Sequence, residues 1–354
     1  MKVLATIIYF FLGALLVDAQ TVLSANNPGN TYEDINAVLA PGFNVVEVPD
    51  CVHTSFGRHV DEVFDAQLNT HVFRFRLHVT PDNDRCLNFD RQRAEIKTYD
   101  KSPNHLKATY GETVKYKWKF KLPADFQSSQ FFTHIHQIKS VDGPFASMPM
   151  ITLTTRQNSM HRLQLRYAPQ DTQSTIAQVD ITPFLGEWIE ATEIITFHDS
   201  GSYSLELKRI SDNEILFDYS NLIDTWQDGA SFARPKWGLY RSLNFAEELQ
   251  DEQVFFNDLS IEENPTLSIN DIEAYPQRNV HLSENPSSQK VFVVNAEQNS
   301  YDKINIYDSL GRNSIHLDPK PDHSIDISEL KAGLYFIVLS KNNLKMATLK
   351  CIIK

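Results

Sequence analysis

The chain has 354 residues, a formal net charge of −12 and a hydrophobic content of 42%. This hydrophobic content is normal for a folded protein and too high for a disordered one, and the length suits two or three domains. The acidic excess argues against nucleic-acid binding. An anionic ligand would therefore need basic residues that are gathered locally.

Residues 1–19 are predicted to be a secretory signal peptide. Lys2 precedes an uncharged apolar run from Leu4 to Val17, and Ala19 ends a Val-x-Ala pattern. A membrane anchor is the alternative, but the run is short for a span of about 20 residues. We expect a secreted protein with no membrane span, located outside the cell or at its surface.

Residues 20–262 are predicted to be all-β, with a β-jelly-roll (two-sheet sandwich) fold, because many short alternating strands are separated by turn signals. A short helix is expected in residues 30–40. In an oxidising compartment we expect a disulfide between Cys51 and Cys86, with two buried thiols as the alternative. Cys351 is expected to be unpaired.

The strand predicted over residues 91–97 has an unusual charged face. Arg91, Arg93, Glu95 and Lys97 alternate with less polar residues and share one side. Such a face must meet water or a charged ligand. We expect a groove strand that binds a polyanion, with Glu95 ionised and holding a neighbouring cation; a solvated outer face is the alternative.

Three segments of this domain resemble jelly-roll polysaccharide lyases. They are "RAEIK" (93–97), "HIHQIK" (134–139) and "KWGLYRS" (236–242). The family most similar overall is that of the ulvan lyases, polysaccharide lyase family 28. The resemblance implies β-elimination of an acidic, uronate-containing polysaccharide, with ulvan as the substrate and alginate or glucuronan as alternatives.

The same resemblance implies a site on these segments. Tyr240 matches the family tyrosine and would act as catalytic base and acid, with its pKa lowered by nearby cations, namely Arg93, Lys139 and Arg241. Arg91, Arg93, Lys97 and Arg241 are the expected substrate-binding residues.

The strand over residues 134–139 leaves two alternatives open. His134 and His136 share one face, and Gln137 and Lys139 share the other. Either pair lines the groove, or a bulge admits members of both. All four are candidate catalytic residues, as carboxylate partners or as a second base.

Residues 263–284 are predicted to be a linker, and 285–354 a small β-sandwich. "INIYDSLGR" (304–312), "IDISELKAGLYFIVL" (325–339) and the end "CIIK" resemble the C-terminal sorting domain of type IX secretion. This resemblance implies the secretion machinery as a partner. A carbohydrate-binding appendage is the alternative.

No cofactor is expected to be required, and no histidine or cysteine cluster has zinc spacing. The acidic loops 80–84 and 197–202 offer oxygen ligands for a structural calcium ion, with solvated turns as the alternative. Two other classes are a jelly-roll glycoside hydrolase, which needs a carboxylate pair, and a non-catalytic binding module for acidic carbohydrates. We expect a monomer.

Overall fold

The computed structural model describes residues 20–264, 281–294, 301–308, 312–341 and 344–354. The predicted signal peptide and most of the predicted linker lie outside these residues. Within the described part, no helix is both long and apolar enough to cross a membrane.

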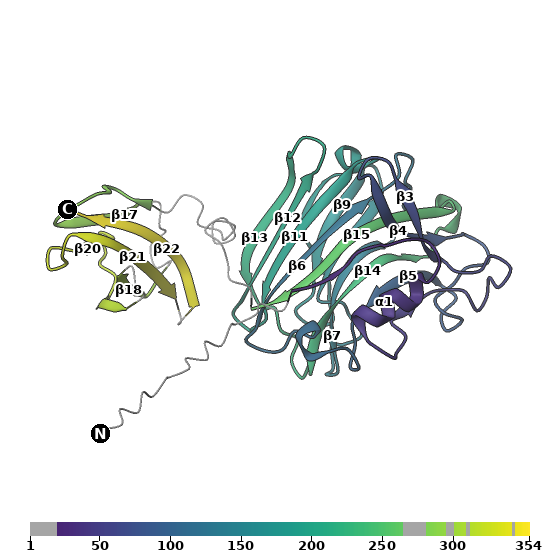
Figure 1. Ribbon diagram of the computed structural model, residues 1–354, viewed down its shortest axis with the longest axis horizontal. Helices are drawn as coiled ribbons and strands as arrows, with labels where there is room; N and C mark the ends of the chain where they lie inside the picture. Colours follow the sequence, from purple (N-terminus) through teal and green to yellow (C-terminus); the bar gives the residue numbers. More distant parts are fainter. Residues whose placement is uncertain (1–19, 265–280, 295–300, 309–311, 342–343) are drawn as a thin grey trace, which may run out of the picture.

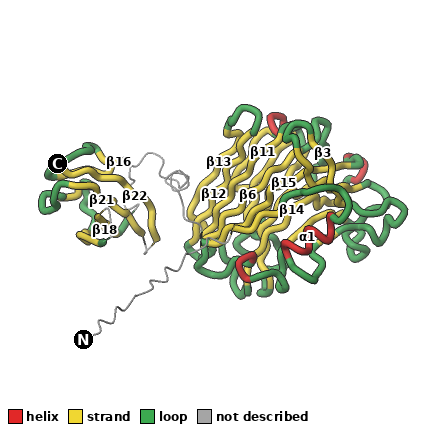
Figure 2. Tube along the Cα trace, viewed as in Figure 1, coloured by secondary structure: helices red, strands yellow, loops and turns green. Residues whose placement is uncertain are grey.

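The first unit is a sandwich of two antiparallel sheets, which confirms the predicted fold class (Figures 1 and 2). One sheet has the order β13-β12-β11-β6-β15-β4-β3, with β1 also paired to β15, and the other has the order β10-β9-β8-β7-β14-β5-β2. The strands of the first sheet are β1 (Gln20–Leu23), β3 (Val60–Asp65), β4 (Thr70–Leu77), β6 (Thr113–Lys121), β11 (Trp188–Thr196), β12 (Gly201–Arg209), β13 (Ile215–Ile223) and β15 (Glu252–Glu263). Those of the second are β2 (Val46–Glu47), β5 (Arg91–Lys97), β7 (Thr133–Val141), β8 (Ile151–Gln157), β9 (His161–Tyr167), β10 (Ser174–Asp180) and β14 (Phe232–Ser242).

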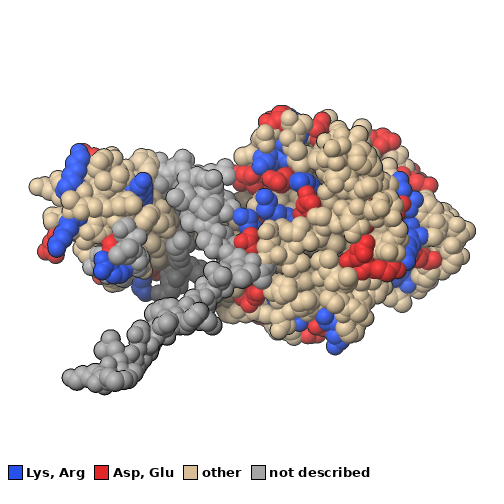
Figure 3. Space-filling model, viewed as in Figure 1, with Lys and Arg blue, Asp and Glu red and all other residues tan. Residues whose placement is uncertain are grey.

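The alternation of β6 shows how the sandwich is built. Its apolar residues, such as Trp118, are buried between the sheets, and its lysines are half-exposed on the outside. Lys119 lies 2.7 Å from Asp258, and Lys121 lies 3.4 Å from Asp65. Figure 3 shows basic and acidic side chains next to one another on this unit. The lysine row is therefore a solvated and charge-paired face.

Helix α1 (Thr31–Leu39) covers the edge of the sandwich near β5 in Figure 1. Thr31, Ile35 and Leu39 are buried, as expected for residues four apart on one helical face. The predicted disulfide between Cys51 and Cys86 is formed, with the Cα atoms 6.4 Å apart. Three 3₁₀ turns complete this unit: Asn104–Leu106, Thr182–Phe184 and Ala246–Glu248.

The C-terminal unit has its own hydrophobic core, which includes Ile306, Ile337 and Leu339. Its two sheets have the orders β16-β17-β20 and β19-β18-β21-β22. The strands are β16 (His281–Leu282), β17 (Lys290–Val294), β18 (Lys303–Asp308), β19 (Asn313–Leu317), β20 (Ser324–Asp326), β21 (Gly333–Lys341) and β22 (Leu344–Ile353). Cys351 is a buried free thiol within this core.

Candidate active site

A β-bulge in β7 determines which of its side chains face outward. The pairing of β7 with β8 changes register between His134 and His136. Ile135 and His136 are both buried in the sandwich interior. His134, Gln137 and Lys139 therefore come together on the outer face of the sheet. Of the alternatives left open by the sequence, the structure adopts the bulge that admits members of both pairs.

A pocket of about 470 Å³ opens on this outer face. Its lining residues come from five consecutive strands of the seven-stranded sheet, in the order β9, β8, β7, β14 and β5, and from the loops beside them. The sequence-predicted site residues that line it are Arg91, Arg93, His134, Gln137, Lys139 and Tyr240. Residues more than 100 positions apart in the sequence thus share one cavity.

Tyr240 lies between two arginines of β5. Its hydroxyl accepts a hydrogen bond of 3.0 Å from Nη1 of Arg91, and the guanidinium carbon of Arg93 lies 3.7 Å from the ring centroid. The predicted lowering of the pKa of Tyr240 is wrong. Burial raises this pKa, and the two arginines only oppose the effect. The Tyr240 hydroxyl is therefore protonated at neutral pH and suited to donate a proton.

His134 is buried beside Tyr240, with the two ring centroids 5.9 Å apart. Its ring stacks on Phe132 at 4.7 Å, and its Nδ1 has no hydrogen-bond partner. Burial lowers the pKa of His134 well below its usual value, and the nearby Arg156 adds to the shift. The imidazole is therefore neutral at neutral pH and has a nitrogen that can accept a proton.

Lys139 provides a cation whose charge is easily lost. Its Nζ donates a hydrogen bond of 2.9 Å to the carbonyl oxygen of Ser147. Burial lowers the pKa of Lys139 to about 8, and the positive charges of Lys236 and Arg93 contribute. Lys139 is charged at neutral pH and becomes neutral in mildly alkaline solution.

A buried ion network holds Arg93 in place. Glu95 bonds to Nη1 of Arg93 and lies 2.9 Å from Nζ of Lys236, while Asp84 accepts a 2.8 Å bond from Nε of Arg93. Glu47 lies 2.6 Å from the same lysine. Burial alone would lower the pKa of Arg93, but the charges of Glu95 and Glu47 raise it instead. Glu95 also accepts a bond from the side-chain amide of Gln137.

Gly238 permits the close approach of β14 to β5 at the pocket. It pairs with Glu95 and has φ of +139°. A Cβ there would lie 2.2 Å from the carbonyl oxygen of Ala94. Any larger residue would push the two strands apart and move Tyr240, two positions later, away from Arg93.

Two sequence-predicted site residues lie elsewhere. His136 is 1% exposed, and its Nε2 lies 2.9 Å from Glu193 of the opposite sheet. Arg241 is fully buried, and its Nε donates a 2.8 Å bond to the side chain of Gln92. Arg241 points into the interior because it follows Tyr240 directly in β14, and successive side chains of a strand face opposite sides. His136 points into the interior because the bulge reverses the alternation after His134. His136 and Arg241 therefore lie outside the pocket.

Lys97 is on the predicted face of β5 but does not line the pocket. Its Nζ donates a 2.6 Å bond to Glu47. This ion pair makes Lys97 part of the network that supports Arg93, and not a free cation for substrate.

Two further arginines line the pocket, Arg156 of β8 and Arg166 of β9, and neither was predicted as a site residue. Arg166 is held by hydrogen bonds to Gln173 and Thr175, and Nε of Arg156 is buried without a partner. Among the described residues, neither guanidinium is in an ion pair with a carboxylate. The only signal in the sequence was their place among alternating residues of two ordinary strands.

A family model described as polysaccharide lyase matches residues 58–260, and a model of the secretion system C-terminal sorting domain matches residues 285–354. A search of curated proteins found no match.

Several solved structures are similar. An endo-β-1,4-glucuronan lyase from the fungus Trichoderma reesei has 18% identity and a TM-score of 0.39, over 71% of this chain and 92% of that one. An alginate lyase from Pseudomonas aeruginosa has 17% identity and a TM-score of 0.39, over 57% and 85%. The alginate lyase Aly36B has 9% identity and a TM-score of 0.46, over 69% and 98%. Similarity at this level carries no argument about substrate.

The lyase model covers more than half of the chain, so the chain belongs to the polysaccharide lyase family. The sorting domain makes it a secreted or cell-surface member, which uses the type IX secretion machinery.

Proposed function

We propose that this lyase cleaves ulvan, a sulfated uronate polysaccharide, by β-elimination to unsaturated oligosaccharides. The observation that carries the proposal is the pocket in which a neutral imidazole, a protonated phenol and several cations converge. The elimination removes the C5 proton of a uronate and breaks the C4–O4 bond. Each of these steps requires a different property of the pocket.

The substrate carboxylate must be neutralised, because negative charge builds up on it as the C5 proton leaves. Preorganised donors and cations supply that stabilisation in a site from which water is excluded. Lys139 is the cation, because its Nζ bonds only a backbone carbonyl oxygen and no carboxylate among the described residues, and Gln137 is held beside it by Glu95. Arg93 does not take this role, because its guanidinium is tied to Asp84 and Glu95.

The two proton transfers fall to His134 and Tyr240. His134 accepts the C5 proton, since its imidazole is neutral and lines the pocket beside Tyr240. Tyr240 donates its proton to O4, since burial keeps the phenol protonated. Positioned acids and bases of this kind each contribute about 10²–10⁴ to the rate.

Ulvan is favoured over alginate and glucuronan by Arg156 and Arg166. Sulfate esters distinguish ulvan from these two polymers. The guanidinium group of arginine binds the oxygens of such anions through two parallel N–H donors. Both arginines line the pocket and neither is paired with a carboxylate among the described residues, so their positive charge can act on a sulfate group there.

The test is to incubate the purified protein with ulvan, desulfated ulvan, alginate and glucuronan, and to follow the ultraviolet absorbance of the unsaturated product. We expect ulvan to give the largest signal and desulfated ulvan a smaller one. New reducing ends without absorbance would identify a glycoside hydrolase instead. Binding without either product would identify a carbohydrate-binding module.

A further inference from the structure

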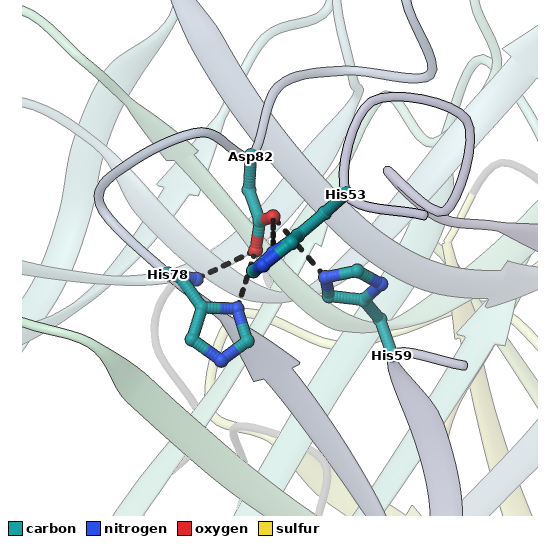
Figure 4. A group of neighbouring side chains, drawn as sticks. All are labelled: His53, His59, His78 and Asp82. Atoms are coloured by element: carbon teal, nitrogen blue, oxygen red, sulfur yellow. Dashed lines mark hydrogen bonds and ion pairs between the residues drawn. The ribbon is translucent and has the colours of Figure 1, made fainter. Parts of the chain in front are cut away.

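Three histidines and one aspartate converge at a place that the proposed reaction does not use. His53, His59 and His78 surround the carboxylate of Asp82 (Figure 4). Their nearest ring nitrogens lie 2.8, 3.1 and 3.0 Å from its oxygens. One ligand atom from each of the four residues lies within 4.8 Å of the others.

We propose that these four residues form a structural zinc site. Histidine nitrogens and one carboxylate oxygen are a preferred ligand set of Zn²⁺, and bonds of about 2.0–2.1 Å put the ligands of a tetrahedral ion roughly 3.3 Å apart. The separations around Asp82 are close to this value. Calcium, for which the acidic loop 80–84 offered oxygen ligands, does not suit three imidazoles.

The burial of the four residues suits a closed site. The side chains of Asp82 and His59 are fully buried, while those of His53 and His78 are 18% and 19% exposed. A buried carboxylate is stable only with compensating partners, and a bound divalent cation would offset the charge of Asp82. Four protein ligands leave no open position for a reacting water, which makes the site structural and not catalytic.

The surroundings orient the ligands. Nδ1 of His59 lies 2.7 Å from Asp50, so that Nε2 is the nitrogen directed at Asp82. Such a carboxylate–histidine contact sets the tautomer in metal sites. Phe56 packs against the rings of His53, His59 and His78 at 4.2–5.1 Å and shields the cluster.

The position of the site explains what the ion would stabilise. All four ligands lie within the segment closed by the Cys51–Cys86 disulfide. Gln92 of β5 donates hydrogen bonds to the carbonyl oxygens of His78 and Asp82. Asp84, two residues after the last ligand, holds Arg93 in the pocket. The ion would therefore fix the loop that positions this arginine over Tyr240.

The test is metal binding by the mature, metal-free protein, titrated with Zn²⁺ and separately with Co²⁺. We expect one equivalent of zinc, a higher thermal unfolding temperature when it binds, and the visible absorption of tetrahedral Co²⁺. The Co²⁺ spectrum needs no variant, so it tests the site even if the variants fold poorly.

Two variants locate the site, and one serves as a matched control. His78→Gln should weaken zinc binding by at least about 100-fold, and Asp50→Asn by roughly 10–100-fold. His71→Gln changes a histidine of β4 that is not a ligand and should bind zinc normally. If the wild-type protein binds no zinc, or if His78→Gln binds it equally well, the cluster is only a hydrogen-bonded group and the proposal is wrong.

Discussion

In the proposed reaction Tyr240 and His134 have different roles, because burial has opposite effects on the pKa of a phenol and that of an imidazole. Removing water disfavours the charged form of each group, so it raises the pKa of Tyr240 and lowers that of His134. At neutral pH the pocket thus holds one proton donor and one proton acceptor. The arginines beside Tyr240 do not reverse this balance, although the sequence alone suggested that they would.

Tyr240→Phe should lower kcat by at least about 10², because it removes the proton donor while the ring and its packing remain. Substrate binding should change little. Steady-state kinetics on ulvan would measure both effects. Tyr219→Phe, in β13 of the other sheet, is the control and should behave like wild type. A folded Tyr240→Phe enzyme with normal turnover would rule out this assignment.

If Lys139 binds the substrate carboxylate as proposed, the reaction should be sensitive to alkaline pH. Its pKa is lowered to about 8, so kcat/KM should fall as the pH rises through this value and the cation loses its charge. Lys139→Arg keeps the charge at higher pH and should move the fall upward by a pH unit or more. An unchanged alkaline limb in this variant would show that another group is responsible.

At the scale of elements, the bulge of β7 gives this strand two functions. On the outside it presents His134 to the pocket, and on the inside it presents His136 to Glu193 of β11. Glu193 also accepts a 2.8 Å bond from the hydroxyl of Tyr203. The strand therefore links the two sheets through a polar contact in an otherwise apolar core.

Glu193→Leu should destabilise the sandwich, because it leaves His136 and Tyr203 buried without their partner. Each unsatisfied group costs about 1–3 kcal/mol. Denaturant unfolding would measure the loss. Glu214→Gln, where the wild-type side chain is 60% exposed, should change stability by less than about 1 kcal/mol. Equal stability of the two variants would contradict a structural role for the His136–Glu193 pair.

At the scale of the whole molecule, an acidic chain concentrates positive charge at one place. The net charge is −12, yet five cationic side chains line one pocket, and three of them, Lys139, Arg156 and Arg166, have no carboxylate partner among the described residues. This local excess attracts a polyanion that the rest of the surface would repel.

The KM for ulvan should therefore rise with ionic strength. At about 0.15 M salt the screening length is near 8 Å, so the long-range attraction is lost first and kcat is affected less. Kinetics between low salt and marine salt would measure the change. A KM that does not depend on salt would argue against a cation-lined binding site.

Truncation after Asn264 should leave a folded and active lyase, because the first unit has a complete core of its own. The thermal unfolding temperature of this unit and its turnover on ulvan should match those of the longer protein. Loss of both on truncation would mean that the C-terminal unit supports the lyase fold.

Much of the architecture follows from the sequence, because strand alternation is a local property. The alternating residues of β6, the short helix α1 and the Cys51–Cys86 pair were all predicted from neighbouring residues or from the compartment. The motif segments also brought Arg93, Gln137 and Tyr240 into one site. Their order along the chain was sufficient, since they match segments of a known family.

What only the tertiary structure decided depends on contacts between distant segments. A single bulge changes the phase of β7, and no local pattern announced it, so His136 could not be separated from His134 in advance. The pKa of Tyr240 depends on burial, which is a property of the folded pocket. The cluster of His53, His59, His78 and Asp82 has no motif spacing, because two loops and the adjoining ends of two strands bring its members together. Alternation along a strand determines which side chains share a face. Only the packing of the two sheets and their loops determines which of these faces lie against one another.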